Sequence, residues 1–194
     1  MSTVSSGLMM DFPLTTQHLL WRMENVWGTS RVVTVLDDHP STAVTTFREV
    51  AHDARRLAAG LAALGVRPDD RVGSFSWNHA AHLAAYYGVM GMGAVLHTIN
   101  LRLSAEQIVW TVQHARDRVI LLDGTLAEQF APLLSRLPGV EHVVVMGALP
   151  DGVSVPGAVA YDDLLAGADS SFVFLHQRVN HTPYMNNCQS RRRA

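Results

Sequence analysis

The chain has 194 residues, of which 48% are hydrophobic and 16% are charged, so its length favours one domain with a sizeable core and its composition argues against disorder. A single cysteine, Cys188, excludes an internal disulfide, and the first fifteen residues hold no basic segment of the kind that opens a signal peptide. These features predict a protein of a reducing compartment, with the cytoplasm as the expected location.

The charge is unevenly distributed along the chain. All fifteen cationic residues are arginine; residues 1–169 hold seventeen acids and eleven arginines, whereas residues 170–194 hold four arginines and no acid. A basic tail on an acidic body can indicate nucleic acid or a membrane surface as the partner. Because no aromatic residue is interleaved with Arg191–Arg193, we favour an unstructured tail and expect no nucleic-acid partner.

The first third of the chain shows helical and strand patterns in alternation. In chain order they predict a mobile arm over 1–14, a helix over 16–27, a hairpin with strands at 32–36 and 43–46, and a helix over 47–64. The second helix has clear end signals, because Thr46 and Glu49 have the spacing of a capping box and Gly65 stands at the expected C-terminal position.

The central stretch, between Arg71 and Arg102, has thirty residues and no Asp, Glu, Lys or Arg. We interpret it as a buried strand over 72–77, a helix over 79–90 with Asn78 as its N-cap, and a buried strand over 94–99. Such a βαβ unit requires parallel strands. The alternative is a transmembrane helix, but interior glycines and histidines disfavour it and we expect no membrane-spanning segment.

The remaining pattern extends the same alternation. It predicts a helix from the Ser104/Gln107 capping box to about His114, a strand over 118–122, a helix from a Thr125/Glu128 capping box to about Leu137, a strand over 141–146, a short helix over 161–165, and one more strand over 172–175. The fold class is therefore α/β, an open and mostly parallel sheet with helices on both faces, preceded by a small hairpin.

Motifs that carry chemistry are few. Gly88, Gly91 and Gly93 form a reversed dinucleotide-like pattern, but they end a helix, so we assign them to helix termination and tight packing. His79 and His82 could share a metal, yet no third ligand is near in sequence, and core or capping roles are favoured. A small flavodoxin-like nucleotide binder is disfavoured because no strand-to-helix turn is glycine-rich. We assign no catalytic, cofactor-binding or metal-binding residue.

The span from Thr46 to Asp123 resembles the AMP-forming fatty-acyl-CoA ligases of the adenylate-forming superfamily, in its medium- and long-chain branch. The resemblance rests on FREVAHDARRLAAGLAALGVRPDDRV, SWNHAAHLAAYYGVMGMGAVLHTINLRLS and HARDRVILLD. The N-terminal LMMDFPLTTQHLLWRM and the later VEHVVVMG and YDDLLAG extend it to about residue 170. Leu101 stands where this family commonly has Pro, and Asp69 where it commonly has Gly.

The resemblance implies a two-step reaction in which a fatty acid, ATP with Mg and CoA give acyl-CoA, AMP and pyrophosphate. The family's Thr/Ser/Gly phosphate loop is expected just after Phe172 and Val173, where this chain reads FLHQRVNHTPYMNN, and the chain has no lysine. We therefore expect a partial ligase N-terminal domain over 15–171 and a divergent, disordered basic tail over 172–194. This truncated form is expected to bind no cofactor and to be inactive alone.

A second hypothesis comes from a different functional class. The same half-domain could serve as a non-catalytic binding or dimerisation module, since the family's N-terminal arm often takes part in dimer contacts. That resemblance implies a homodimer formed through the segment Met9–Trp27.

Overall fold

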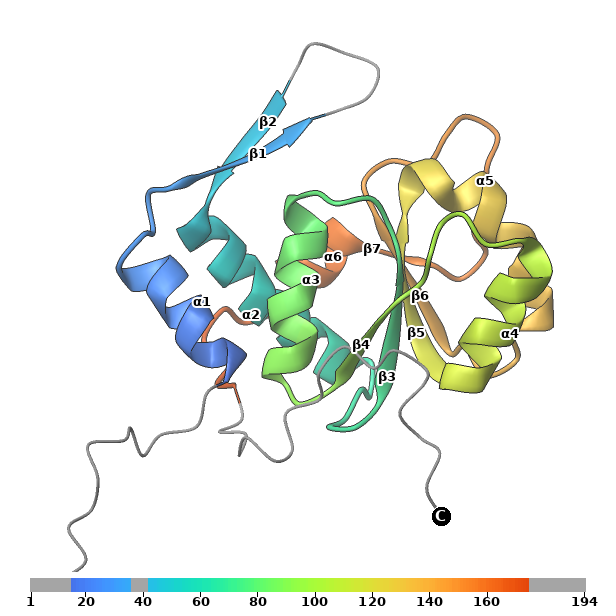
Figure 1. Ribbon diagram of the computed structural model, residues 1–194, viewed down its shortest axis with the longest axis horizontal. Coiled ribbons are helices and arrows are strands. Elements are labelled where there is room, and N and C mark those ends of the chain that lie inside the picture. The colour runs from blue at the N-terminus through green and yellow to red at the C-terminus, as the bar shows by residue number, and fades with distance from the viewer. Residues whose placement is uncertain (1–14, 36–41, 175–194) are drawn as a thin grey trace, which may run out of the picture.

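The computed structural model describes residues 15–35 and 42–174, in which helices and strands alternate along the chain (Figure 1). In chain order the elements are α1 (Thr16–Asn25), β1 (Arg31–Val35), β2 (Thr42–Thr46), α2 (Phe47–Ala63), β3 (Arg71–Phe75), α3 (Ala80–Gly91), β4 (Val95–Thr98), α4 (Ala105–Ala115), β5 (Asp117–Asp123), the 3₁₀ helix η1 (Gly124–Leu126), α5 (Ala127–Phe130), the 3₁₀ helix η2 (Ala131–Arg136), β6 (His142–Met146), β7 (Val159–Ala160) and α6 (Tyr161–Ala166).

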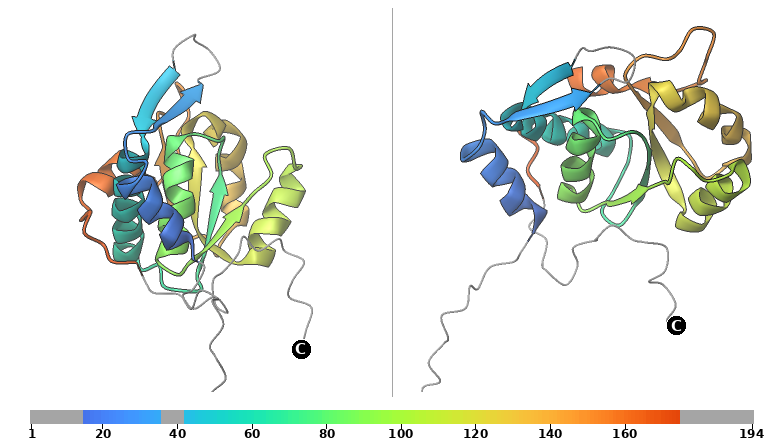
Figure 2. Two further views of the ribbon diagram at one scale, coloured as in Figure 1. Left: turned by 60° about the vertical axis from the view of Figure 1, so that its left-hand side comes forward. Right: turned by 45° about the horizontal axis from the view of Figure 1, so that its top comes forward.

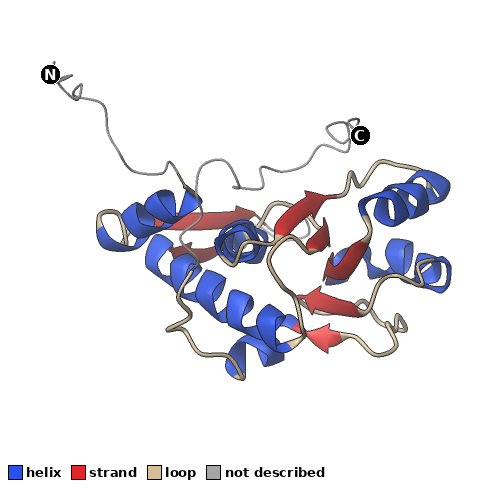
Figure 3. Ribbon diagram, turned by 90° about the horizontal axis from the view of Figure 1, so that it is seen from below, coloured by secondary structure: helices blue, strands red, loops and turns tan. Residues whose placement is uncertain are grey.

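Five strands form one parallel sheet in the order β4-β3-β5-β6-β7, and β1 and β2 form a separate antiparallel hairpin. Parallel neighbours require crossover connections, so helices lie on both faces of the sheet (Figure 3). The hairpin stands apart from the sheet, at the end of the molecule where α2 and α3 begin (Figure 2). The predicted fold class, with its small hairpin, is confirmed.

The two faces of the sheet carry separate apolar clusters because side chains alternate along each strand. On one face α2, α3 and α6 cover a cluster that includes Val72 and Leu121, and on the other α4 and α5 cover one that includes Phe75 and Ile120. A third, smaller cluster joins α1 to α2 and α3. The two strands of the charge-free stretch thus lie between two helical layers, and α3 belongs to one of those layers. Among the described residues, no helix is long and apolar enough to cross a membrane.

Helices α2 and α3 approach each other closely because small residues lie at their contact. A Cβ atom built on Gly88 would lie 2.6 Å from the backbone oxygen of Ala54, and one on Gly91 would lie 2.5 Å from the ring of Phe174. Gly93 has a φ of 88°, which ends the helix region in a left-handed turn. The assignment of these three glycines to packing and helix termination is therefore confirmed.

Two of the three expected capping boxes are present. Thr46 and Glu49 open α2, and Ser104 and Gln107 open α4, each with both reciprocal hydrogen bonds. Gly65, just past α2, has a φ of 86° as its position requires. Asp69 has a φ of 70°, which is a left-handed conformation. Glycine adopts this conformation readily, which explains why it is common at this position in the family that the chain resembles.

The third expected capping box, Thr125 with Glu128, is absent, and the helix expected from it to about Leu137 is divided into three short pieces. The Asp123 side chain, not Thr125, accepts the first free N–H group, and the segment runs as η1, α5 and η2. Pro132 lacks the N–H group of a regular helix. The expected strand over 172–175 is also wrong for its described part, because residues 172–174 form no strand. The side chains of Phe172 and Phe174 pack instead against the apolar clusters to which α2 and α3 contribute.

Some expectations lie outside the described residues. These are the mobile arm over 1–14, the tip of the hairpin, and the tail from residue 175 onward. The short strand β7, which pairs with β6, has no clear signal in the sequence because only two residues take part.

The close contact at Gly88 generates a stability prediction. Gly88→Ala is expected to lower the free energy of unfolding by about 1–3 kcal/mol, because the added methyl meets a backbone oxygen that cannot move aside without shifting a helix. Chemical denaturation measures the loss. The control is Gly139→Ala, where a Cβ meets nothing within 4 Å and the change should stay within about 0.5 kcal/mol. Equal effects of the two substitutions would contradict the packing account.

Candidate functional site

A pocket of about 610 Å³ opens at the carboxyl ends of β3 and β4, between the hairpin and the start of α3. Its lining residues are Val32, Val33, Thr34, Ser76, Asn78, His79, His82, Leu83, Tyr86 and Thr98. In open parallel sheets ligands bind at the carboxyl ends of the strands. We call this the carboxyl-edge pocket, and it is the candidate site.

The N-terminus of α3 forms the polar wall of this pocket. The N-cap is His79, whose Nδ1 accepts the backbone N–H of His82 at 3.2 Å. The expected cap, Asn78, is one residue too early, and its side chain lines the pocket instead. The next free N–H group, that of Ala80, donates to the hydroxyl of Thr34 in β1 at 3.3 Å, which ties the hairpin to α3.

The hydrogen bonds of His79 fix its tautomer. Because Nδ1 accepts a backbone N–H, the ring proton of the neutral imidazole lies on Nε2. That nitrogen lies 3.1 Å from Oδ2 of Asp123 at the end of β5 and 3.0 Å from Oγ of Ser76. The Ser76 hydroxyl donates to the carbonyl oxygen of Trp77 at 2.9 Å.

This arrangement of Ser76, His79 and Asp123 differs from a nucleophilic triad. In a triad the histidine uses one nitrogen for the serine and the other for the carboxylate. Here both partners share Nε2, which carries the proton, so His79 cannot accept a proton from Ser76. The group therefore holds the end of β5 against the start of α3 and does not activate a nucleophile.

The two titratable neighbours of His79 are held in defined states. Burial alone raises the pKa of Asp123, but hydrogen bonds from His79 and Thr125 outweigh it and leave the pKa below its ordinary value. Burial, and then the adjacent His79, lower the pKa of His82. The Nε2 atom of His82 lies 3.1 Å from the Ser74 hydroxyl. Asp123 is thus a carboxylate and His82 a neutral imidazole at pH 7.

A shared metal at His79 and His82 finds no support in this geometry. Nε2 of each ring has a protein partner, and Nδ1 of His79 serves as the helix cap. Across residues 15–35 and 42–174, no three His, Cys, Asp or Glu side chains are grouped so that they could hold a metal ion.

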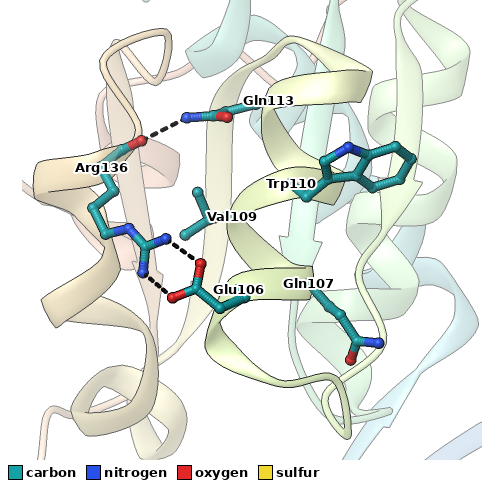
Figure 4. Close-up of a pocket in the computed structure, with 6 residues that line it drawn as sticks. All are labelled: Glu106, Gln107, Val109, Trp110, Gln113 and Arg136. Atoms are coloured by element: carbon teal, nitrogen blue, oxygen red, sulfur yellow. Dashed lines mark hydrogen bonds and ion pairs between the residues drawn. The ribbon is translucent and has the colours of Figure 1, made fainter.

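A second hollow, of about 430 Å³, lies along α4 (Figure 4). Across it, Nη1 and Nη2 of Arg136 donate to Oε1 and Oε2 of Glu106 at 2.9 and 2.5 Å. The side chain of Gln113 donates to the carbonyl oxygen of Arg136. Trp110 is exposed and stacks on His114 with ring centroids 4.7 Å apart. These contacts join α4 to η2, so we assign the hollow to helix packing.

The sequence alone assigned no site residue. It favoured a core or capping role for His79, which the structure confirms, and it missed three residues of the site: Thr34, Ser76 and Asp123. One signal for Asp123 was present. It follows a buried strand that neighbours β3, and the carboxyl ends of adjacent parallel strands meet at one edge. Thr34 gave no such signal, since its contact with Ala80 joins segments far apart in the chain.

The chain matches the family model described as AMP-binding enzyme over residues 26–173. It is 38% identical over 168 residues to a 3-methylmercaptopropionyl-CoA ligase of Ruegeria lacuscaerulensis, which covers 86% of this chain and 31% of the relative. It is 36% identical over 170 residues to a medium-chain-fatty-acid–CoA ligase of Ectopseudomonas oleovorans, which covers 87% of this chain and 31% of the relative.

A long-chain-fatty-acid–CoA ligase of Thermus thermophilus is 41% identical over 157 residues, covering 81% of this chain and 28% of the relative. Among solved structures, an anthranilate CoA ligase bound to anthranoyl-AMP superposes with a TM-score of 0.75 at 21% identity, covering 87% of this chain and 31% of that one. The acetoacetyl-CoA synthetase of Streptomyces lividans superposes with a TM-score of 0.73 at 23% identity, covering 86% of this chain and 27% of that one. These two structural likenesses concern the fold.

The chain belongs to the AMP-binding enzyme family, and its relatives by sequence include acyl-CoA ligases. It spans about a third of the length of the curated relatives it matches.

The contact between His79 and Asp123 generates a pH prediction. Asp123→Asn is expected to lower the free energy of unfolding at pH 7 by about 1–3 kcal/mol, because the charged acceptor is lost. The folded-state pKa lies below the unfolded value, so this stability is present above about pH 4 and is lost as the pH falls through the folded pKa. Urea titrations from pH 2.5 to 7 measure both effects.

The matched control is Asp151→Asn, which changes an exposed loop carboxylate. A difference between wild type and Asp123→Asn that does not shrink on acidification would contradict the assigned role of Asp123.

Proposed function

We propose that this chain is the N-terminal part of a fatty-acid–CoA ligase, an enzyme that converts a fatty acid, ATP and CoA into acyl-CoA, AMP and pyrophosphate. The observation that carries the proposal is the family match over residues 26–173 together with 36–41% identity to medium- and long-chain-fatty-acid–CoA ligases. We infer a cytoplasmic location, a partial ligase domain over 15–171 and a divergent tail over 172–194.

Within such a ligase the carboxyl-edge pocket would form one wall of the substrate site. Its lining combines aliphatic side chains of Val32, Val33 and Leu83 with neutral polar groups of Asn78 and Thr98. This chemistry suits an uncharged chain with occasional hydrogen-bonding groups, since no lining residue is an acid or an arginine. The negative charge of Asp123 behind the wall disfavours an anion there.

Adenylation should not occur on this chain by itself. A triphosphate needs backbone N–H groups of a glycine-rich loop, a cation and magnesium ligands that converge on it. Residues 1–194 contain no such loop motif and no lysine. At the starts of α2, α3 and α4, side chains of Thr46, His79 and Ser104 already accept backbone N–H groups.

The corresponding prediction concerns isotope exchange. The purified chain with ATP, magnesium and octanoate or palmitate is expected to give no pyrophosphate–ATP exchange above a boiled control, and calorimetry should find no micromolar affinity for ATP. The full-length Thermus thermophilus relative serves as the positive control for the assay. Acid-dependent exchange by the chain would overturn the claim that it cannot adenylate alone.

A second candidate, a dimerisation module, is favoured by the surface of α1 and the turn after it. Trp21 and Trp27 are 57% and 56% exposed, and Leu19 and Val26 are also exposed. Large apolar side chains on one element of a soluble domain mark interaction sites. We infer that the segment Met9–Trp27, of which residues 9–14 lie outside the described part, takes part in a homodimer contact.

The dimer prediction is tested by sedimentation velocity. The wild-type chain is expected to form a dimer or larger species at micromolar concentration, and Trp21→Gln with Trp27→Gln should weaken association at least tenfold. Trp110→Gln, which changes an equally exposed tryptophan on α4, should leave it unchanged. A monodisperse wild-type monomer, or equal effects of both sets of substitutions, would count against the contact.

A further inference from the structure

The last described segment, Ser171–Phe174, lies on a surface of helices although its sequence favours a strand. Phe172 and Phe174 are half-buried, whereas Val173 between them is 83% exposed. Alternate burial of this kind is typical of an extended segment that rests one face on a support. Among the described strands none pairs with it, and the chain after α6 runs back beside α1 and α2 (Figures 1 and 2). The support is therefore the helical layer.

Gly91, the last residue of α3, leaves room for the Phe174 ring. A Cβ atom built on Gly91 would lie 2.5 Å from two carbon atoms of that ring, which is closer than real Cβ contacts. Phe172 meets Phe174 edge to face, with ring centroids 6.0 Å apart and an angle of 66° between the rings. Any side chain at position 91 would displace the ring, so the surface suits a flat aromatic group at this point.

Phe174 also connects two of the three apolar clusters. It packs against the cluster that α2, α3 and α6 cover on one face of the sheet. It packs as well against the smaller cluster, to which α1 contributes Leu20 and Met23. The ring therefore closes a surface on which the docking of α1 depends.

Arg55 of α2 links the same ring to α1. Its guanidinium carbon lies over the ring of Phe174, 6.0 Å from the centroid, which is within the range of a cation–π contact. Nη1 and Nη2 of Arg55 donate to Oε1 and Oε2 of Glu24 in α1 at 3.0 and 2.5 Å. The side chains of Arg55 and Glu24 are 21% and 20% exposed, and a charge pair weakens as water gains access to it. A ring over the guanidinium thus supports the tie between α1 and α2.

We propose that this surface, which we call the three-helix seat and define by Arg55, Gly91 and the cluster around Leu20 and Met23, is a binding site for an extended segment with aromatic side chains two residues apart. The occupant is the chain's own segment Phe172–Phe174. Occupation covers the contact between Arg55 and Glu24 and fastens α1 to α2. The site is separate from the carboxyl-edge pocket, which lies at the opposite end of α3, and it does not depend on the ligase assignment.

The experiment compares three forms of the full chain by amide hydrogen exchange, with α1 as the reporter and β5 as the internal reference. In the double variant Phe172→Ala with Phe174→Ala, protection of the α1 amides is expected to fall at least fivefold relative to the wild type. Val173→Ala changes the exposed residue between the two rings and should leave protection as in the wild type. Equal protection of α1 in the wild type and the double variant would overturn the proposal.

A peptide added in trans distinguishes a binding site from packing that only the intact chain can form. The capped peptide SSFVFL, which copies residues 170–175, is added to the double variant at millimolar concentration. It is expected to restore at least half of the lost α1 protection, and the peptide SSAVAL should restore none. The wild type, whose own segment competes at high effective concentration, should bind SSFVFL at least tenfold more weakly than the double variant does. Equal effects of the two peptides, or no rescue by SSFVFL, would refute the binding site.

A measurement on the wild type keeps the test independent of how the double variant folds. Nuclear Overhauser contacts are expected between the ring protons of Phe174 and the Hα atoms of Gly91, since the ring lies against that glycine. The side chain of Val173, which is exposed, should show no contact with Gly91. Absence of the contacts between Phe174 and Gly91 would refute the three-helix seat.

Discussion

The close approach of α2 and α3 is the constraint on which the rest of the fold depends. A glycine at position 88 lets the backbone of α3 rest against the carbonyl oxygen of Ala54, so that α2 and α3 pack side by side over one face of the sheet. Apart from Arg71 at the start of β3, the helix and its flanking strands carry no charged side chain, as burial against an apolar core requires. Once α3 is fixed in this position, its N-terminus is fixed against the carboxyl ends of β3 and β5.

The polar network at that N-terminus converts the packing into a site. His79 caps α3 with one nitrogen and contacts Asp123 with the other, while Thr34 brings β1 onto the same helix end. Each contact joins elements that are distant in sequence, so the pocket forms only when the sheet, the helix and the hairpin are all in place. The result is a neutral, partly apolar wall and not a reactive centre, which agrees with a chain that spans about a third of the length of the acyl-CoA ligases it matches.

The sequence predicted the architecture well because its local signals agree with one another. The capping boxes at Thr46 and Ser104 and the stop at Gly65 act within a few residues, and they are present in the structure. The cap of α3 was misplaced because Asn78 is the better N-cap by local preference, whereas tertiary contacts with Asp123 select His79. Similarly, Asp123 replaced Thr125 as the cap of the next turn. The site residues were missed for the same reason: their roles come from contacts between distant strands.

The central claim is that this chain supplies the N-terminal third of an acyl-CoA ligase fold, carboxyl-edge pocket included. The most direct test is a chimera in which the matched 157-residue segment replaces its counterpart in the Thermus thermophilus long-chain ligase, to which it is 41% identical. With a fatty acid, ATP, magnesium and CoA, the account predicts that the chimera forms acyl-CoA above the level of the relative lacking that segment. A folded, monodisperse chimera that forms none would contradict it.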